Sequence, residues 1–243
     1  MKKILKLAAV LLILFGLYTG AQYAVRNKLI FINDLFVKEN DIHGVDLSEY
    51  QGEVNMEALK EQNVQFVIIK ATEGSGHVDP YFDQNWQNAE DSGIIAGAYH
   101  FFSFDSSGLT QAQQYIDTVG SLEGKMKPVV DIEYYADKKD NPPSADDVRK
   151  EVQLFVDAIE KEYGVKPLIY ASDNIYKQYL AGYFDDCQRW VPSIYYPAFV
   201  NHGNNWLIWQ YSDQGQLEGV GGTHVDMNVL NRNADLSDLL LGE

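Results

Sequence analysis

Hydrophobic and polar positions divide the chain into an apolar N-terminal run and a longer region in which two periodicities alternate. From Ile42 onward, short apolar runs typical of strands follow segments with helical spacing. The pattern predicts eight strands: Ile42–Leu47, Phe66–Ala71, Ile94–Phe102, Pro128–Ile132, Pro167–Ala171, Trp190–Ile194, Leu207–Tyr211 and His224–Asn228. It also predicts five helices: Met56–Gln62, Tyr81–Ser92, Leu109–Leu122, Ala145–Tyr163 and Asn174–Leu180.

The segment Ala145–Tyr163 carries the clearest helix signals. Ser144 is a suitable N-cap, and apolar residues then recur from Val148 to Ile159 at helical spacing. Gly164 follows as a suitable C-cap. We therefore expect a helix whose two ends are set by its own sequence.

Strands that alternate with helices indicate parallel β/α units of the α/β class, with the strands buried on both faces. Helices separate the first five predicted strands, whereas short loops alone separate the last three. No linker-like tract or repeat interrupts residues 42–236. We expect one barrel domain over residues 41–236, irregular in its final third, with a C-terminal tail at residues 237–243.

The N-terminus has the pattern of an export signal. Residues 1–6 carry three lysines, and Leu7–Val25 is an uncharged, largely apolar run of 19 residues. That length is close to the roughly 20 residues that span a bilayer as a helix. We expect residues 1–25 to be a signal anchor that leaves the rest outside the cell membrane, with residues 26–40 as a stem. A signal peptide cleaved near Thr19–Ala21, followed by secretion, is the alternative.

Charge and cysteine content limit the partners and the chemistry. Beyond residue 28 the chain has 14 Lys and Arg against 35 Asp and Glu, a formal charge of −21. A domain with this negative charge repels nucleic acid and anionic lipid. We therefore expect no nucleic-acid partner and membrane contact through the N-terminal segment only. We also expect the protein to be a monomer. The one cysteine, Cys187, excludes an internal disulfide framework and is expected to be a buried thiol.

Acidic residues close three of the predicted strands. In β/α barrels the chemistry gathers at the C-terminal ends of the strands, and here these ends hold Asp46, the pair Asp131 and Glu133, and Asp226. Asp131 and Glu133 are two apart, so both side chains point to one side of the strand. Close carboxylates raise each other's pKa, and a protonated carboxyl group at neutral pH suits the general acid of glycosidic cleavage. A solvated loop or an all-oxygen cation site is also compatible with this pattern.

Aromatic and amide side chains fall at the same strand ends. Tyr99 and Phe101 lie on the third predicted strand, Tyr170 on the fifth, and Trp209 and Gln210 on the seventh. Rings beside carboxylates and amides suit a sugar-binding groove, although each ring would also suit the core. The five histidines form no transition-metal motif.

Seven motifs in order resemble one family over residues 42–230. The chain resembles glycoside hydrolase family 25, the muramidase-type lysozymes. The motifs are Gly44–Gly52, Phe66–Gly74, Val78–Phe82, Gly97–Phe102, Asp131–Glu133, Trp209–Ser212 and Val225–Asn228.

The resemblance implies a modified TIM-like barrel, (β/α)5β3, that needs no metal or organic cofactor. It implies hydrolysis of the β-1,4 bond between N-acetylmuramic acid and N-acetylglucosamine in peptidoglycan glycan strands, with net retention. Glu133 is the expected general acid/base and Asp131 its assistant, and Asp46 and Asp226 complete the acidic cluster. The implied substrate-binding residues are Tyr99, Phe101, Tyr170, Trp209, Gln210, Tyr195 and Asn228.

One position departs from the family pattern. A groove-lining Tyr commonly follows the sixth-strand Trp by four residues, whereas here Tyr195 follows Trp190 by five. Two other functions stay open: a wall-binding module without catalysis, and a glycosidase of another amino-sugar polymer such as chitin. Wall remodelling, passage for a secretion or conjugation machine, and lysis are all compatible roles, and an anchor favours local cutting.

Overall fold

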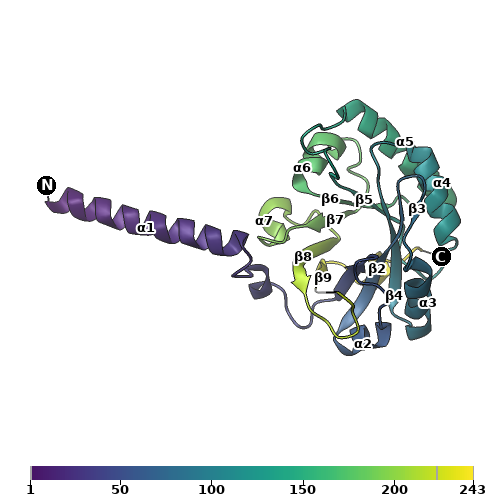
Figure 1. The fold of residues 1–243 in the computed structure, drawn as a ribbon, viewed down its shortest axis with the longest axis horizontal. Coiled ribbons are helices and arrows are strands. Elements are labelled where there is room, and N and C mark those ends of the chain that lie inside the picture. Colours follow the sequence, from purple (N-terminus) through teal and green to yellow (C-terminus); the bar gives the residue numbers. More distant parts are fainter. Residues whose placement is uncertain (1, 223, 243) are drawn as a thin grey trace.

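Eight strands close into a barrel in the computed structural model, which describes residues 2–222 and 224–242. The strands are β1 (His43–Leu47), β2 (Val64–Glu73), β4 (Ile95–Phe101), β5 (Val129–Ile132), β6 (Leu168–Ala171), β7 (Arg189–Pro192), β8 (Ile208–Gly215) and β9 (Val225–Leu230). The sheet order is β1-β9-β8-β7-β6-β5-β4-β2, and the pairing of β1 with β2 closes the ring (Figure 1). All eight predicted strands are present, and the expected α/β barrel is confirmed. The two-residue strand β3 (His77–Val78), an antiparallel partner of the end of β2, was not predicted.

The last strand of the barrel runs against its neighbours. The barrel strands other than β9 pair in parallel, whereas β9 is antiparallel to both β8 and β1. The connection from Gly215 to Val225 is too short for the crossover of a dozen or more residues that a parallel pair needs. The prediction that Asp226 closes its strand was therefore wrong, because Asp226 is the second residue of β9.

Helices cover the outside of the barrel (Figure 1). They are α2 (Met56–Glu61), α3 (Phe82–Ser92), α4 (Gly108–Val119), α5 (Ala145–Tyr163) and α6 (Asp173–Ile175), which continues into the π-helical turn η2 (Tyr176–Leu180). The bounds of α5 are those predicted, with Ser144 accepting a hydrogen bond from the Asp147 N–H and Gly164 at a φ of 74°. A further helix, α7 (Ala198–His202), lies between β7 and β8, where only a loop was expected. Its five residues are too few to show a helical period.

The core has two layers, separated by the strands. Along β2, Phe66 and Ile68 pack inside the barrel with Tyr99 and Trp190, whereas Val67 and Ile69 pack outward beneath the helices. The same alternation turns Lys70 inward at the C-terminal end of β2. Leu239, from the predicted tail, is fully buried in the inner layer with Met126, so residues beyond 236 contribute to the barrel core.

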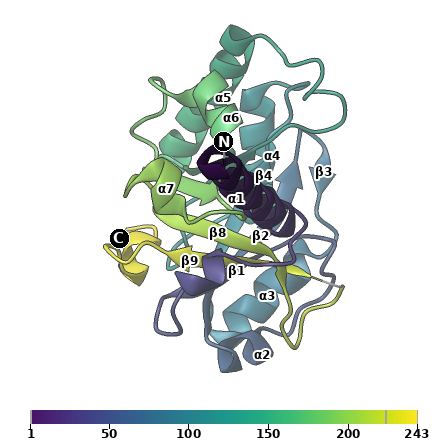
Figure 2. The same cartoon turned by 90° about the vertical axis from the view of Figure 1, so that its left-hand side faces the viewer.

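A long apolar helix, α1 (Lys2–Arg26), projects away from the barrel (Figure 1). Its most apolar stretch of 18 residues has a mean hydropathy of 2.1 and no buried residue, so by length and composition it could cross a membrane. Seen from the side of this helix, α1 stands in front of the barrel, near β8 and α7 (Figure 2). Cys187 is buried, as expected from the sequence.

Candidate active site

The four predicted acids gather at one rim of the barrel. Asp46 stands at the C-terminal end of β1 and pairs in antiparallel register with Asp226 at the start of β9. Asp131 is the next-to-last residue of β5, and Glu133 directly follows the strand. The reversal of β9 is what brings Asp226 to this rim, since its first residues lie beside the last residues of β1. The structure brings the four acids to one rim, and it does so through a reversal of β9 that the sequence analysis did not predict.

The Asp46 carboxyl group is held by two amides and by a second carboxyl group. Asn228 Nδ2 donates to Asp46 Oδ1 at 2.6 Å, and Gln210 Nε2 lies 3.1 and 3.3 Å from its two oxygens. Burial, followed by the negative charge of Asp226, raises the pKa of Asp46 well above its usual range. Burial, followed by the negative charge of Asp213, raises the pKa of Asp226 to about 6.

Two aromatic residues inside the barrel hold these amides in place. Trp190 Nε1 donates to Asn228 Oδ1 at 2.8 Å, and the Tyr170 hydroxyl donates to Gln210 Oε1 at 2.9 Å. The two rings meet edge to face, with their centroids 4.6 Å apart. Since each amide oxygen is engaged by a ring donor, each NH₂ group is directed at Asp46. Gln210, Asn228 and Tyr170 thus lie at the rim as predicted, and Trp190 joins them.

Glu133 is a half-buried carboxyl group beside an open cavity. Burial and then the negative charge of Asp226 raise its pKa to about 7. The adjoining cavity has a volume of about 690 Å³, and its lining includes Glu133, Tyr134, Lys139, Ser172, Asn174 and Lys177. Near neutral pH a substantial fraction of Glu133 is therefore protonated at a surface that a ligand can reach.

Asp131 lies deeper than Glu133. Its side chain is 8% exposed, and its Oδ1 has no hydrogen-bond partner among the described residues. Burial, followed by the charges of Glu133 and Asp46, raises its pKa well above the usual range, while the Lys70 ammonium opposes the shift. An unpaired buried oxygen is costly, so Asp131 is poised to accept or donate a hydrogen bond when a ligand arrives.

Lys70 is a rim residue that the sequence analysis missed. It is 7% exposed, its Nζ contacts Glu73 at 2.6 Å, and it lies 5.2 Å from the centre of the Phe101 ring. Because Phe66 and Ile68 on the same strand point inward, period-two alternation could have placed Lys70 inside the barrel mouth. It supplies a positive charge to an acidic site.

The other predicted sugar-binding residues divide between the rim and the outer wall. Tyr99 is buried beneath the acids, and its ring meets Trp190 edge to face. Phe101 is half-buried, and Tyr195 is exposed after the end of β7. Trp209 instead packs on the outer face with Val191, and its Nε1 donates to the backbone oxygen of Ser193. The alternation that turns Gln210 inward turns Trp209 away from the acids.

Most of the histidines stand apart from the acids. His100 is fully buried between Thr72 and Gln111, and burial lowers its pKa to about 4. His43 is at the opposite end of β1 from the acids and contacts Lys38 O at 2.9 Å. In residues 2–222 and 224–242, no group of three or more His, Cys, Asp or Glu is placed to hold one metal ion.

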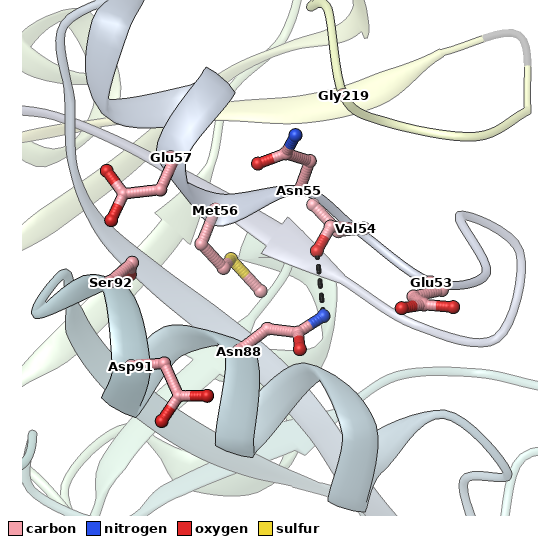
Figure 3. A pocket seen from close by; sticks show the side chains of 9 residues that line it. All are labelled: Glu53, Val54, Asn55, Met56, Glu57, Asn88, Asp91, Ser92 and Gly219. Atoms are coloured by element: carbon pink, nitrogen blue, oxygen red, sulfur yellow. Dashed lines mark hydrogen bonds between the residues drawn. The ribbon is translucent and has the colours of Figure 1, made fainter.

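A second cavity, of about 470 Å³, lies between α2 and α3 (Figure 3). Its wall includes Glu53, Met56 and Asp91, and Asn88 Nδ2 donates across it to the backbone oxygen of Val54 at 3.1 Å. None of the four clustered acids lines it. The acidic rim, and not this cavity, therefore combines perturbed carboxyl groups with aromatic side chains.

Comparison with known proteins gives one consistent result. The sequence model of glycosyl hydrolases family 25 matches residues 45–220. Escherichia coli protein YegX is 38% identical over 195 residues, or 78% of this chain and 70% of YegX. Lysozyme M1 of Streptomyces globisporus is 30% identical over 209 residues, or 79% of this chain and 69% of the lysozyme. The structure of a family 25 glycosyl hydrolase from Bacillus anthracis has a TM-score of 0.77 and 40% identity, covering 83% of this chain and 94% of that one.

Proposed function

The chain belongs to family 25 of the glycosyl hydrolases, and on this premise we propose that it cuts the β-1,4 bond between N-acetylmuramic acid and N-acetylglucosamine in peptidoglycan. Its similarity to Lysozyme M1 supports a muramidase-type activity. The observation that carries the proposal is the pKa of about 7 for Glu133, in a cluster of four acids.

Glu133 is the proposed general acid/base. A glycosidic oxygen leaves as an alcohol only if it gains a proton, and Glu133 holds one at neutral pH because burial and the Asp226 charge disfavour its ionised form. Once its proton is transferred, the carboxylate is the matching base for the incoming water. The cavity beside it leaves room for the two sugar rings.

Asp131 is the proposed assistant. Its buried Oδ1 lacks a partner among the described residues, so the N–H of the substrate's 2-acetamido group would supply the missing hydrogen bond. That bond would orient the acetamido oxygen towards the anomeric carbon. In its ionised form, Asp131 would also stabilise positive charge on the ring. We expect net retention of anomeric configuration on this basis and on the family resemblance.

Asp46 and Asp226 are proposed to control the proton balance of the rim. Because the pKa of Asp46 is raised well above its usual range and that of Asp226 to about 6, we expect Asp46 to keep its proton near neutral pH and Asp226 to be largely ionised. The burial of Glu133 and then the negative charge on Asp226 keep Glu133 protonated. Tyr99, Phe101, Tyr170 and Tyr195 are the proposed walls of the glycan groove, with Gln210 and Asn228 beneath them. Trp209 is left out because it packs on the outer face.

The deciding experiment is Glu133→Gln with purified peptidoglycan as substrate. We expect the release of new muramic acid reducing ends to fall by about 10²–10⁴-fold, since the amide cannot donate the proton. Glu160→Gln, an exposed change on α5, is the matched control and keeps full activity. Undiminished release by Glu133→Gln would remove Glu133 from the mechanism.

Product analysis separates the remaining functions. Mass spectrometry of the fragments from the wild-type chain, beside Glu133→Gln, is expected to find muramic acid at the new reducing ends. Binding to walls without any new ends would indicate a non-catalytic module, and preferential cleavage of chitin would indicate another amino-sugar substrate. The anomer formed first, followed by NMR, tests retention.

We further propose that α1 is an uncleaved signal anchor for a single catalytic barrel, present as a monomer on the extracytoplasmic face of the membrane. The support is its length, its hydropathy of 2.1 and its exposure. This placement favours local wall cutting over secreted bacteriolysis. Alkaline extraction of membranes is expected to leave the full-length chain in the pellet. A shortened chain in the culture medium, cleaved near Ala21, would contradict the anchor.

A further inference from the structure

The segment between α1 and the barrel is fixed to the barrel. Asn33 is buried in it, and its Nδ2 donates to the backbone oxygens of Ser193 at 2.7 Å and Tyr211 at 2.8 Å. Arg232 donates to the backbone oxygen of Phe36 and pairs with Asp41 at 2.7 Å. Buried hydrogen bonds of this kind hold a segment in one conformation, so the stem acts as a bracket and not as a flexible linker.

The bracket meets the rim that carries the acids. Ser193 directly follows β7, Tyr211 lies on β8 next to Gln210, which contacts Asp46, and Lys28 forms an ion pair with Asp213 on β8. One turn inside α1, Gln22 accepts a hydrogen bond from the Tyr196 hydroxyl at 3.0 Å. The C-terminal end of α1 is therefore next to the mouth of the barrel.

An exposed apolar surface surrounds the base of α1. We call it the stem–α7 surface and define it by seven residues: Leu29, Ile30, Phe31, Leu35, Phe36, Phe199 and Val200. Leu35 is 81% exposed and Val200 59% exposed, and the rings of Phe36 and Phe199 join the two parts at 5.4 Å. Soluble surfaces rarely gather so many large apolar side chains without a partner.

We infer that the stem–α7 surface is seated in the lipid headgroup layer, which holds the barrel with its catalytic mouth close to the membrane. This inference rests on the proposed anchor. The helix that would leave the bilayer at Arg26 is followed within three residues by Leu29, so lipid is the apolar medium continuous with this surface. Apolar faces of this kind settle about 5–10 Å into the headgroup boundary. The substrate it favours is then glycan that lies next to the membrane.

The test uses the full-length chain in nanodiscs of zwitterionic lipid, in a Cys187→Ala background. An environment-sensitive dye is attached at Val200→Cys or, as the distant site, at Glu160→Cys on α5. Lipids spin-labelled near the headgroup are expected to quench the dye at position 200 and to leave the dye at position 160 bright. Equal brightness at both positions would overturn the inference.

Paired variants test the surface and the bracket. Leu35→Glu with Phe199→Glu places charges where lipid is proposed, and Asn33→Ala removes the two bracket hydrogen bonds, so both are expected to relieve the quenching at position 200. Leu109→Glu, at an exposed leucine on α4, is the matched control and leaves it unchanged. Energy transfer between dyes on two copies without lipid quenching would assign the surface to a second copy of the chain and overturn the lipid inference.

Activity is measured on the same samples to separate this inference from the proposed function. If the dyes at positions 200 and 160 are quenched equally in a protein that still releases muramic acid reducing ends, the lipid contact alone is overturned. Quenching at position 200 in a chain without glycosidase activity would overturn the proposed function alone.

Discussion

Asp46 and Asp226 occupy paired positions on the antiparallel strands β1 and β9, where burial and then the negative charge of Asp226 raise the pKa of Asp46 well above its usual range. Asn228 and Gln210 both donate to Asp46 Oδ1, and Asn228 is the closer at 2.6 Å. Oδ2 has only the longer contact of 3.3 Å with Gln210, so it is the less strongly engaged oxygen of Asp46. Four predictions about the rim and the core follow from these and neighbouring contacts.

Replacement of Asp46 by Asn should be tolerated far better than replacement by Ala. Asn has an oxygen to accept from Asn228 and an NH₂ group to donate to Asp226, so it copies the protonated acid. We expect Asp46→Asn to keep kcat within about tenfold, below the ~10²–10⁴-fold loss that removal of an acid–base group causes. Asp46→Ala, which leaves both amides unpaired, should lose more. Equal losses in the two variants would mean that Asp46 works as a carboxylate.

Activity should fall as the pH rises through about 7, because Glu133 then loses its proton. Asp226 is the charge that raises the pKa of Glu133, so Asp226→Asn should move this basic limb to lower pH. The basic limb is measured from the pH dependence of kcat/KM, which reports the pKa of Glu133 in the free enzyme. The position of the limb can be measured even if the variant has a lower maximal kcat/KM. Asp213→Asn is the control, since Asp213 affects the pKa of Asp226 directly and should leave the limb of Glu133 nearly in place. An unmoved limb in Asp226→Asn would assign it to another group.

Trp190→Phe should cost more stability than Trp206→Phe. The first change leaves the buried oxygen of Asn228 without its donor, which typically costs about 1–3 kcal/mol. Trp206 donates to the Gly203 oxygen from a more exposed place, so its loss should cost less. Urea unfolding measures both free energies. Of the two changes, only Trp190→Phe is expected to lower kcat, because Asn228 without its Trp190 hydrogen bond no longer orients Asp46. Equal kcat values in the two variants would show that Trp190 does not position Asp46 through Asn228.

Burial of neutral His100 should make the fold less stable in mild acid. Its pKa is about 4 in the folded protein and 6.5 for a free histidine side chain, so its contribution to stability is complete above pH 6.5 and is lost as the pH falls towards 4. Relative to His100→Gln, the wild-type chain should lose about 2 kcal/mol between pH 7 and pH 5, at 1.36 kcal/mol for each pH unit below 6.5. Urea unfolding at the two pH values measures the difference. A gap between the two proteins that stays constant with pH would show that His100 does not titrate on unfolding.

Local signals were enough to place the barrel strands and the best-marked helix. Apolar runs gave all eight strands, and α5 has the predicted ends because Ser144 and Gly164 cap it. Helix α7 and strand β3 were missed because five and two residues carry no measurable period. The acids were found because Asp46, Asp131 and Glu133 follow apolar runs, which marks strand ends in any barrel.

Direction and partnership were decided by the tertiary structure. The sequence pattern placed Asp226 at the end of its strand, but the short link from β8 reverses β9 and brings its first residues to the rim. Because side chains alternate along β8, Trp209 and Gln210 must face opposite sides of the sheet. Only the closed barrel shows that Gln210 faces the interior and Trp209 the outside. The hydrogen bonds from Asn33 to the backbone of Ser193 and Tyr211 could not be predicted either, because no local sequence pattern indicates them. Residue order sets the period and the ends of each element through local sterics and hydrogen bonds, whereas the inner face, the strand direction and the pKa of Glu133 depend on groups that only the closed barrel brings together.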